Sequence, residues 1–222
     1  SQKMKVLNYY HFSTALQMCA VIGTVAAPLT LYSVELGLDA DRIGILGSLM
    51  AFCQSLALIS IPLTLYFGSK ILSIWTLFSR YIFLLIFLIV PFYKDNLTIV
   101  FYLLFFAMLM FSILRSLSEA AFIPWMQEFI PRDVRGRVIG INGIVCAPFA
   151  LIASYGIKIW LDSREGLERF YLVFFISIIV GLISALLLLK LQGGEKNQKR
   201  NDNQGYLKNL ILATKDKNYN LF

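Results

Sequence analysis

Charged residues are scarce in this chain, and acidic ones above all. Of its 222 residues, 15% are charged, and 13 are aspartate or glutamate. A soluble domain averages about 25% charged residues, so the composition excludes an ordinary soluble protein. Histidine occurs once, as His11, and the sequence holds neither a His-Glu-x-x-His pair nor a Gly-x-x-x-x-Gly-Lys phosphate loop. We therefore expect no enzyme activity, no metal site and no cofactor.

Cysteines and cleavage signals are also few. The three cysteines, Cys19, Cys53 and Cys146, are odd in number and lie in apolar stretches. They are interpreted as buried small side chains, and not as a disulfide or metal framework. The first apolar run reaches spanning length before any small-residue cleavage site, which favours a membrane span over a signal peptide.

Long apolar runs are what the sequence has in abundance. Hydrophobic residues make up 58% of the chain, and the mean hydropathy is +0.71. A helix needs about 20 largely apolar residues to cross a bilayer. We therefore predict an all-α integral membrane protein, with a six-helix bundle over residues 1–191. The expected spans are Tyr10–Ser33, Ile43–Phe67, Ile71–Phe92, Leu97–Ile123, Val138–Trp160 and Phe170–Leu191.

The lysines and arginines predict the orientation of these spans. Thirteen of the 20 fall on the side of the amino terminus, five on the opposite side, and two, Arg80 and Arg115, within spans. Positive charge is enriched in cytoplasmic loops, so both termini are expected in the cytoplasm. The net charge of +7 then reflects topology. It indicates contact with anionic lipid headgroups and gives no reason to expect a nucleic-acid partner.

The character of the chain changes after the sixth expected span. Residues 192–205 are polar and rich in glycine and asparagine, which predicts a flexible cytoplasmic linker. Residues 206–222 again carry apolar side chains at helical spacing, which predicts an amphipathic segment. This segment is expected to lead toward a seventh helix that the 222 residues do not contain.

A charged loop between the fourth and fifth spans carries the most specific motif. It reads Glu128-Phe-Ile-Pro131-Arg-Asp-Val-Arg135-Gly136-Arg137, with Trp125 upstream. This loop, with six spans and a polar linker, resembles the amino-terminal half of a major facilitator superfamily transporter of the bacterial inner membrane. The resemblance implies two inverted three-helix repeats, and a second six-helix half from the same chain continued or from another copy. It also implies a gate formed by Gly68, Lys70, Glu128, Pro131, Arg135, Gly136 and Arg137.

The departures from the family pattern are informative as well. The family motif after the second span reads roughly Gly-x-x-x-Asp-Arg-x-Gly-Arg-Lys, and only Gly68 and Lys70 of it remain here. The antiporter signature of the fifth span is half present, through Gly143 and Pro148. These motifs do not favour a drug-proton antiporter.

Charged residues within spans are costly and usually face a cavity or a partner. Arg115 and Glu119 are four apart, on one helix face. In one interpretation, Glu119 is held by Arg115 and binds a proton or the ammonium group of a substrate. In the other, the two residues form a structural ion pair near the cytoplasmic end of the helix, where the arginine side chain can reach the headgroups. Arg80 lies near the midplane of the third span, and its pairing with Glu119 is an alternative to a solute contact.

Two amides are the best uncharged candidates for contact with a polar solute. Gln17 lies in the first span and Asn142 in the fifth. The resemblance places both spans around the transport cavity. The competing interpretation is hydrogen bonding between helices, for which such residues are common in membranes.

Two functions remain open at this stage. The first is a secondary active transporter of a small solute that works by alternating access, with this chain as one half. The second is a six-helix membrane subunit that binds a substrate and works with partner subunits. The linker and the expected seventh helix favour the first, because a complete six-helix subunit needs neither.

Overall fold

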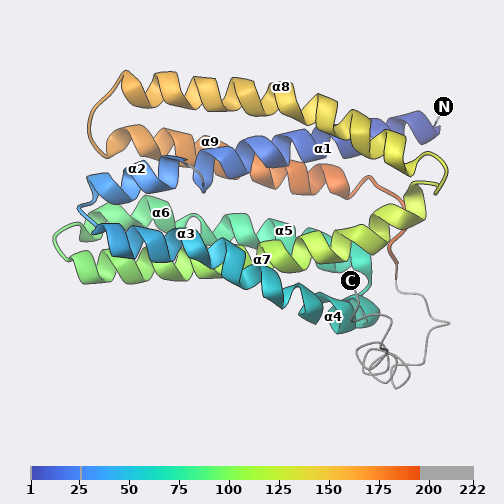
Figure 1. The fold of residues 1–222 in the computed structure, drawn as a ribbon, viewed down its shortest axis with the longest axis horizontal. Coiled ribbons are helices and arrows are strands. Elements are labelled where there is room, and N and C mark those ends of the chain that lie inside the picture. The colour runs from blue at the N-terminus through green and yellow to red at the C-terminus, as the bar shows by residue number, and fades with distance from the viewer. Residues whose placement is uncertain (1, 26, 196–222) are drawn as a thin grey trace, which may run out of the picture.

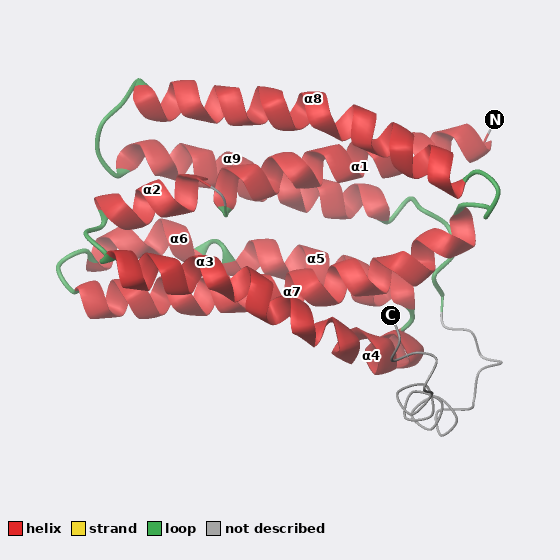
Figure 2. Cartoon of the chain, viewed as in Figure 1, coloured by secondary structure: helices red, strands yellow, loops and turns green. Residues whose placement is uncertain are grey.

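The computed structural model describes residues 2–25 and 27–195, and within these ranges every regular element is helical (Figure 2). The elements are α1 (Gln2–Thr24), α2 (Ala27–Glu35), α3 (Ala40–Gln54), η1 (Ser55–Ile59), α4 (Ser60–Phe67), α5 (Ser69–Phe83), α6 (Ile86–Ile89), η2 (Val90–Tyr93), α7 (Leu97–Phe129), α8 (Arg135–Asp162) and α9 (Glu168–Leu188).

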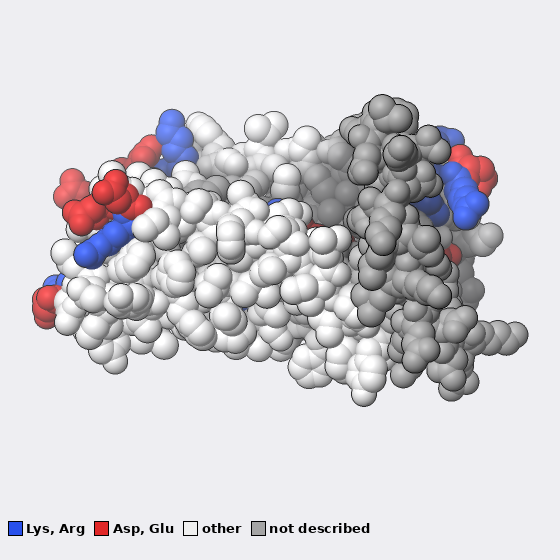
Figure 3. All heavy atoms as spheres, turned by 60° about the horizontal axis from the view of Figure 1, so that its bottom comes forward, with Lys and Arg blue, Asp and Glu red and all other residues white. Residues whose placement is uncertain are grey.

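Six helical segments are long and apolar enough to cross a membrane, so the predicted all-α protein with six spans is confirmed at this level. On the face drawn in Figure 3, charged side chains gather at the two ends, with a nearly uncharged surface between them. In order, the first to sixth spans are Leu7–Glu35, Ala40–Phe67, Ser69–Tyr93, Leu97–Phe129, Arg135–Asp162 and Glu168–Leu188.

Prolines interrupt the first two spans. The ring of a proline inside a helix clashes with the carbonyl four residues earlier. Pro28 would meet Thr24 in this way, and α1 ends at Thr24 while α2 begins at Ala27. Pro62 has the same relation to Leu58, and the helix before it narrows into the 3₁₀ segment η1.

The fourth span differs from its predicted bounds. The span was expected to end at Ile123, directly before Pro124, and this prediction was wrong, because α7 continues through Pro124 to Phe129. A proline removes only one backbone donor. The turn that follows is stabilised by Trp125, whose side chain is completely buried.

The spans form two groups of three (Figure 1). In one group, α1 packs against α8 and α9; in the other, α7 packs against α3 and α5. Contact between α5 and α9 joins the groups. Gly181 of α9 lies directly against the ring of Tyr81 of α5, so the α9 backbone packs on this ring at the junction.

One end of the bundle collects the start of α1, the α4–α5 turn, the α7–α8 loop and the residues after α9 (Figure 1). The residues Leu191–Gly194, which we call the strap, lie across this end against α5 and α7. We therefore call it the strap end. The turns near 36–39, 94–96 and 163–167 lie at the opposite end.

Candidate functional site

A cavity of about 370 Å³ lies between α1 and α7, with single contributions from α8 and α9. It contains Gln17 and Glu119, two candidates that are far apart in the sequence. Within residues 2–25 and 27–195, no other charged side chain lines it. Its full lining is Tyr10, Ser13, Thr14, Gln17, Ser118, Glu119, Phe122, Ile123, Met126, Ile139 and Leu188.

Glu119 is held by Arg115, as the spacing predicted. Nε of Arg115 donates a hydrogen bond to Oε1 of Glu119 at 2.7 Å. The side chains remain 26% and 41% exposed, respectively. At 1.5 Å per residue, Arg115 lies about 21 Å and Glu119 about 15 Å from the end of α7 at Phe129. The pair is therefore not at the helix end, because α7 extends further than the sequence indicated.

Arg80 lies elsewhere, buried between α5 and α7. Its Nη2 donates to the hydroxyl of Tyr81 at 3.0 Å, and its guanidinium lies over the rings of Tyr81 and Phe111. Its Nε and Nη1 have no hydrogen-bond partner within residues 2–25 and 27–195. In the same ranges Arg80 forms no ion pair with Glu119, so the alternative that joined them was wrong.

Asn142 also lies outside the cavity. Its Oδ1 is hydrogen-bonded to Nδ1 of His11 at 3.0 Å, which connects α8 to α1. This contact agrees with the interpretation of Asn142 as a link between helices. The structure thus brings two of the five solute candidates, Gln17 and Glu119, to the same cavity, with Arg115 directly behind Glu119.

Two gate candidates, Lys70 and Glu128, meet Trp125 at the strap. The indole Nε1 of Trp125 donates to the carbonyl of Gln192 at 3.0 Å. Lys70 donates twice, from its backbone N–H to the carbonyl of Gly194 at 3.0 Å and from Nζ to that of Leu191 at 2.6 Å. The backbone N–H of Gly194 donates to the carboxylate of Glu128 at 2.5 Å. Lys70 and Glu128 therefore bind the backbone that follows α9.

The strap requires glycine at its end. Gly193 and Gly194 have φ angles of +81° and +74°, which side chains other than glycine rarely adopt. A Cβ atom on Gly194 would lie 2.6 Å from Cδ1 of Trp125 and 2.7 Å from Cβ of Lys70. A larger residue would have to displace a buried indole.

The other gate candidates shape the loops around the strap. Gly68, with a φ of +88°, forms the turn between α4 and α5. Nη2 of Arg135 donates to the carbonyls of Gln127 and Ile130, both at 3.3 Å, and so caps the end of α7. Pro131, Gly136 and Arg137 are exposed, in the loop and at the start of α8.

The predicted linker, residues 192–205, is described only as far as residue 195, and this part is held in place by the contacts above. Residues 196–205 and the amphipathic segment 206–222 lie outside the described residues. The strap itself was not predicted. The sequence feature that marks the strap is the glycine pair just after the sixth span, and such a pair is equally typical of an unattached linker.

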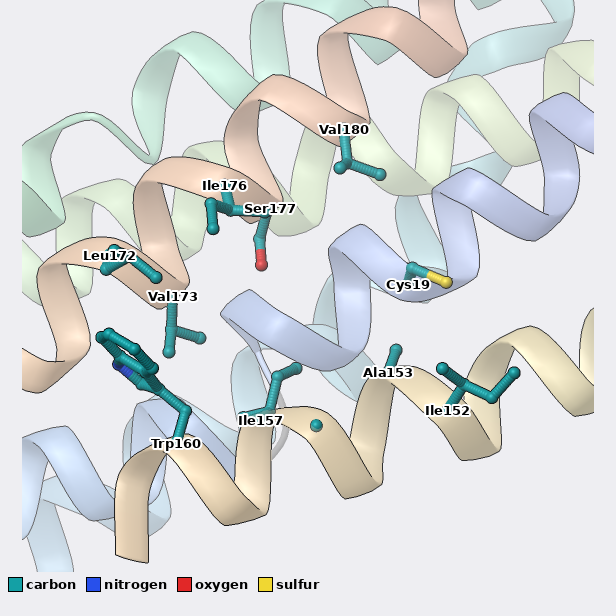
Figure 4. A pocket seen from close by; sticks show the side chains of 11 residues that line it. Cys19, Ile152, Ala153, Ile157, Trp160, Leu172, Val173, Ile176, Ser177 and Val180 are labelled. Atoms are coloured by element: carbon teal, nitrogen blue, oxygen red, sulfur yellow. The ribbon is translucent and has the colours of Figure 1, made fainter. Parts of the chain in front are cut away.

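A second cavity, of about 340 Å³, lies between α1, α8 and α9 (Figure 4). No charged side chain of the described residues lines it, and its walls are mainly aliphatic. Ser177 points from α9 toward α1, where the missing side chain of Gly23 leaves room for its hydroxyl. This cavity suits a lipid chain and offers little to a polar solute.

The strap supports a direct prediction. Replacing Gly194 with alanine is expected to detach it, because the new Cβ collides with Trp125 and Lys70. Amide hydrogen exchange of a peptide covering residues 190–195 should become at least about tenfold faster, since a charge-assisted hydrogen bond is lost. Gly156→Ala is the matched control, because its Cβ meets nothing within 4 Å. Equal exchange in the two variants would show that the strap does not depend on glycine.

Comparison of the chain with protein-family models, with curated proteins and with solved structures gives no match. Among the described residues, no group of three or more His, Cys, Asp or Glu side chains could hold a metal ion. The chemistry of the α1–α7 cavity is therefore the main guide to function.

Proposed function

We propose that the chain is the amino-terminal half of a secondary active transporter of the major facilitator type, which moves a small solute by alternating access. The observation that carries this proposal is the α1–α7 cavity, where Gln17 and Glu119 lie together inside the spanning region. A cavity that holds a carboxylate and an amide among apolar helices is expected where a solute crosses the bilayer.

The exposure of the ion pair supports a second half. Placing a charged side chain in the bilayer centre costs about 2.5–3.5 kcal/mol on insertion scales. Glu119 is 41% and Arg115 26% exposed in this bundle, so lipid against this face would be unfavourable. A second six-helix half facing α1 and α7 would cover both residues and enclose the cavity between the halves.

The helix contacts support the two inverted repeats. The first and fourth spans (α1 and α7) take equivalent places, as do the second and fifth (α3 and α8) and the third and sixth (α5 and α9). Exchanging the members of each pair turns the group in which α1 packs with α8 and α9 into the group in which α7 packs with α3 and α5. The central helices of the groups run in opposite directions, since α1 begins and α7 ends at the strap end (Figure 1). Inverted repeats of this kind are typical of the transporter halves.

Small residues on two helices are consistent with contacts to another half. Gly44 and Gly47 on α3 have open space around their missing side chains, and so do Gly136, Gly140 and Gly143 on α8. Small residues at such positions allow close approach of another membrane helix. The exchange described above relates α3 to α8, so both groups present a similar surface.

Charges at the two ends support a cytoplasmic strap end. Its described loops and helix ends carry more lysines and arginines than acidic residues, as cytoplasmic loops do. The opposite end is rich in carboxylates, from Glu35, Asp39, Asp41, Asp95, Asp162, Glu165 and Glu168. In this orientation the strap joins the cytoplasmic ends of the third, fourth and sixth spans, so that the half can move as one unit.

Cysteine accessibility tests this proposal. In a protein with Cys19, Cys53 and Cys146 replaced by alanine, Gln17→Cys should react with a membrane-impermeant thiol reagent, because alternating access brings water to the cavity. The rate should differ between reagent added inside and outside. Ile183→Cys is the control, since Ile183 is an exposed aliphatic residue of α9. Its depth is similar to that of Gln17, because the carbonyl of the next residue, Ser184, accepts a hydrogen bond from Ser13, one helical turn before Gln17. A Gln17→Cys variant that is unreactive from both sides would reject the proposal.

A further inference from the structure

Three hydroxyl groups in the lining of the α1–α7 cavity donate their hydrogen atoms to backbone carbonyls. Ser13 donates to the carbonyl of Ser184 at 2.8 Å, and Thr14 to that of Tyr10 at 2.8 Å. Ser118 donates to the carbonyl of Ser73 at 3.2 Å. A carbonyl oxygen has no hydrogen atom, so the direction of each bond is fixed.

The hydroxyl of Tyr10 and the carboxylate of Glu119 also have partners. The hydroxyl of Tyr10 donates to the sulfur of Met126 at 3.9 Å. Each hydroxyl has a single hydrogen, so its oxygen can only accept further bonds. Glu119 accepts from Arg115 through Oε1, and Oε2 has no hydrogen-bond partner among the described residues. Gln17 carries the only side-chain donor that remains free in the lining.

Arg115 adds no hydrogen-bond donor to the lining of the cavity. It is absent from the cavity lining, and its Nη1 lies toward Met50 of α3 at 3.9 Å from the sulfur. The nearest charge for a ligand in the cavity is therefore the carboxylate of Glu119. The parallel rings of Tyr10 and Phe122, with centroids 6.0 Å apart, add aromatic surface that attracts cations.

We infer that the cavity binds a small organic cation, a primary ammonium with a short apolar body, through the carboxylate of Glu119. An ammonium group has three donors and no acceptor, which complements the acceptor oxygens of the hydroxyls and the carboxylate in the lining. The body of the ligand lies against the aliphatic side chains of Ile123, Ile139 and Leu188. A primary ammonium would then be the solute class of the proposed transporter. This assignment rests on the proposed function only for its biological meaning, because binding is measured without transport.

Three probes of similar size separate the alternatives: n-hexylammonium, n-hexanoate and n-hexanol. With the purified protein in lipid nanodiscs, titration calorimetry should show hexylammonium binding at least about tenfold more tightly than the other two. Preferential binding of hexanoate would assign the cavity to anions through Arg115 and overturn the inference. Binding of none of the probes up to millimolar concentration would also overturn it.

Two variants identify the group responsible. Glu119→Gln should weaken hexylammonium binding at least about tenfold, whereas Glu165→Gln, which removes an exposed carboxylate at the opposite end, should leave it unchanged. Arg115→Gln should bind hexylammonium at least as tightly as the wild type, because both oxygens of Glu119 become available. Unchanged binding in Glu119→Gln, or tenfold weaker binding in a folded Arg115→Gln variant, would overturn the inference.

Failure of transport and failure of this inference give different results. If hexylammonium binds as described but Gln17→Cys is unreactive from both sides, the transport proposal is rejected and the binding site stands. If Gln17→Cys reacts as expected but hexylammonium does not bind, the solute class is wrong and the transport proposal stands.

Discussion

Alanine at position 181 is expected to push the third and sixth spans apart and to reduce the stability of the folded bundle by about 3 kcal/mol. In Gly181→Ala, the new Cβ atom would lie 2.3 Å from Cε1 and Cζ of Tyr81. The Tyr81 ring is fully buried and lies beneath the guanidinium of Arg80, with 4.9 Å between its centroid and Cζ of the arginine. The ring cannot rotate away without also displacing this buried charge.

Thermal unfolding in lipid nanodiscs, followed by circular dichroism, measures this effect. Gly156→Ala is the control, because its Cβ meets nothing within 4 Å and alanine favours a helix by up to about 1 kcal/mol over glycine. The Gly181 variant should melt well below the wild type, and the control at or slightly above it. Equal melting temperatures for the two variants would show that α5 and α9 are not in close contact at Gly181.

The number and approximate positions of the spans could be predicted because bilayer length and apolar composition decide them. The error at Pro124 has a local cause. The sequence marks a proline as a helix end, but burial of Trp125 favours continuation of α7 to Phe129. That error also misplaced the Arg115–Glu119 pair, which lies deeper along the helix than the sequence suggested.

The candidate site could be predicted only where residues are close in the chain. The pairing of Arg115 with Glu119 follows from helical spacing, and the structure has it at 2.7 Å. That Gln17 lies in the same cavity depends on how α1 and α7 are arranged, which no local pattern encodes. Arg80 shows the same limit, because its contacts with Tyr81 and Phe111 combine two helices.

The strap could not be predicted for a different reason. Its contacts from Trp125, Lys70 and Glu128 are all made to backbone atoms of residues 191–194. Backbone groups are the same at every position, so the sequence of the strap carries no complementary charge or side chain. Glu128 was predicted as part of a gate from the family motif, and the structure gives it a specific acceptor role toward Gly194.

Glu119→Gln is expected to abolish solute uptake driven by a pH gradient in liposomes that contain the complete transporter. The glutamine amide can neither bind and release a proton nor balance the charge of a cation, and Glu119 is the only carboxylate in the cavity. Arg115 would lose the negative charge that it contacts at 2.7 Å and remain as an uncompensated charge within the span. Uptake of radiolabelled hexylammonium should fall to background, with Glu165→Gln at the wild-type level.

Exchange of solute at equal pH distinguishes the two roles that the sequence left open for Glu119. A proton site alone would leave exchange intact, because exchange needs no net proton movement. A site for the solute ammonium requires that exchange of hexylammonium also be lost. This is the result we expect, since Ser13, Thr14 and Ser118 near Glu119 donate to backbone carbonyls and offer the cavity only acceptor oxygens. Intact exchange with abolished pH-driven uptake would assign Glu119 to proton transfer and place the ammonium of the solute elsewhere in the cavity.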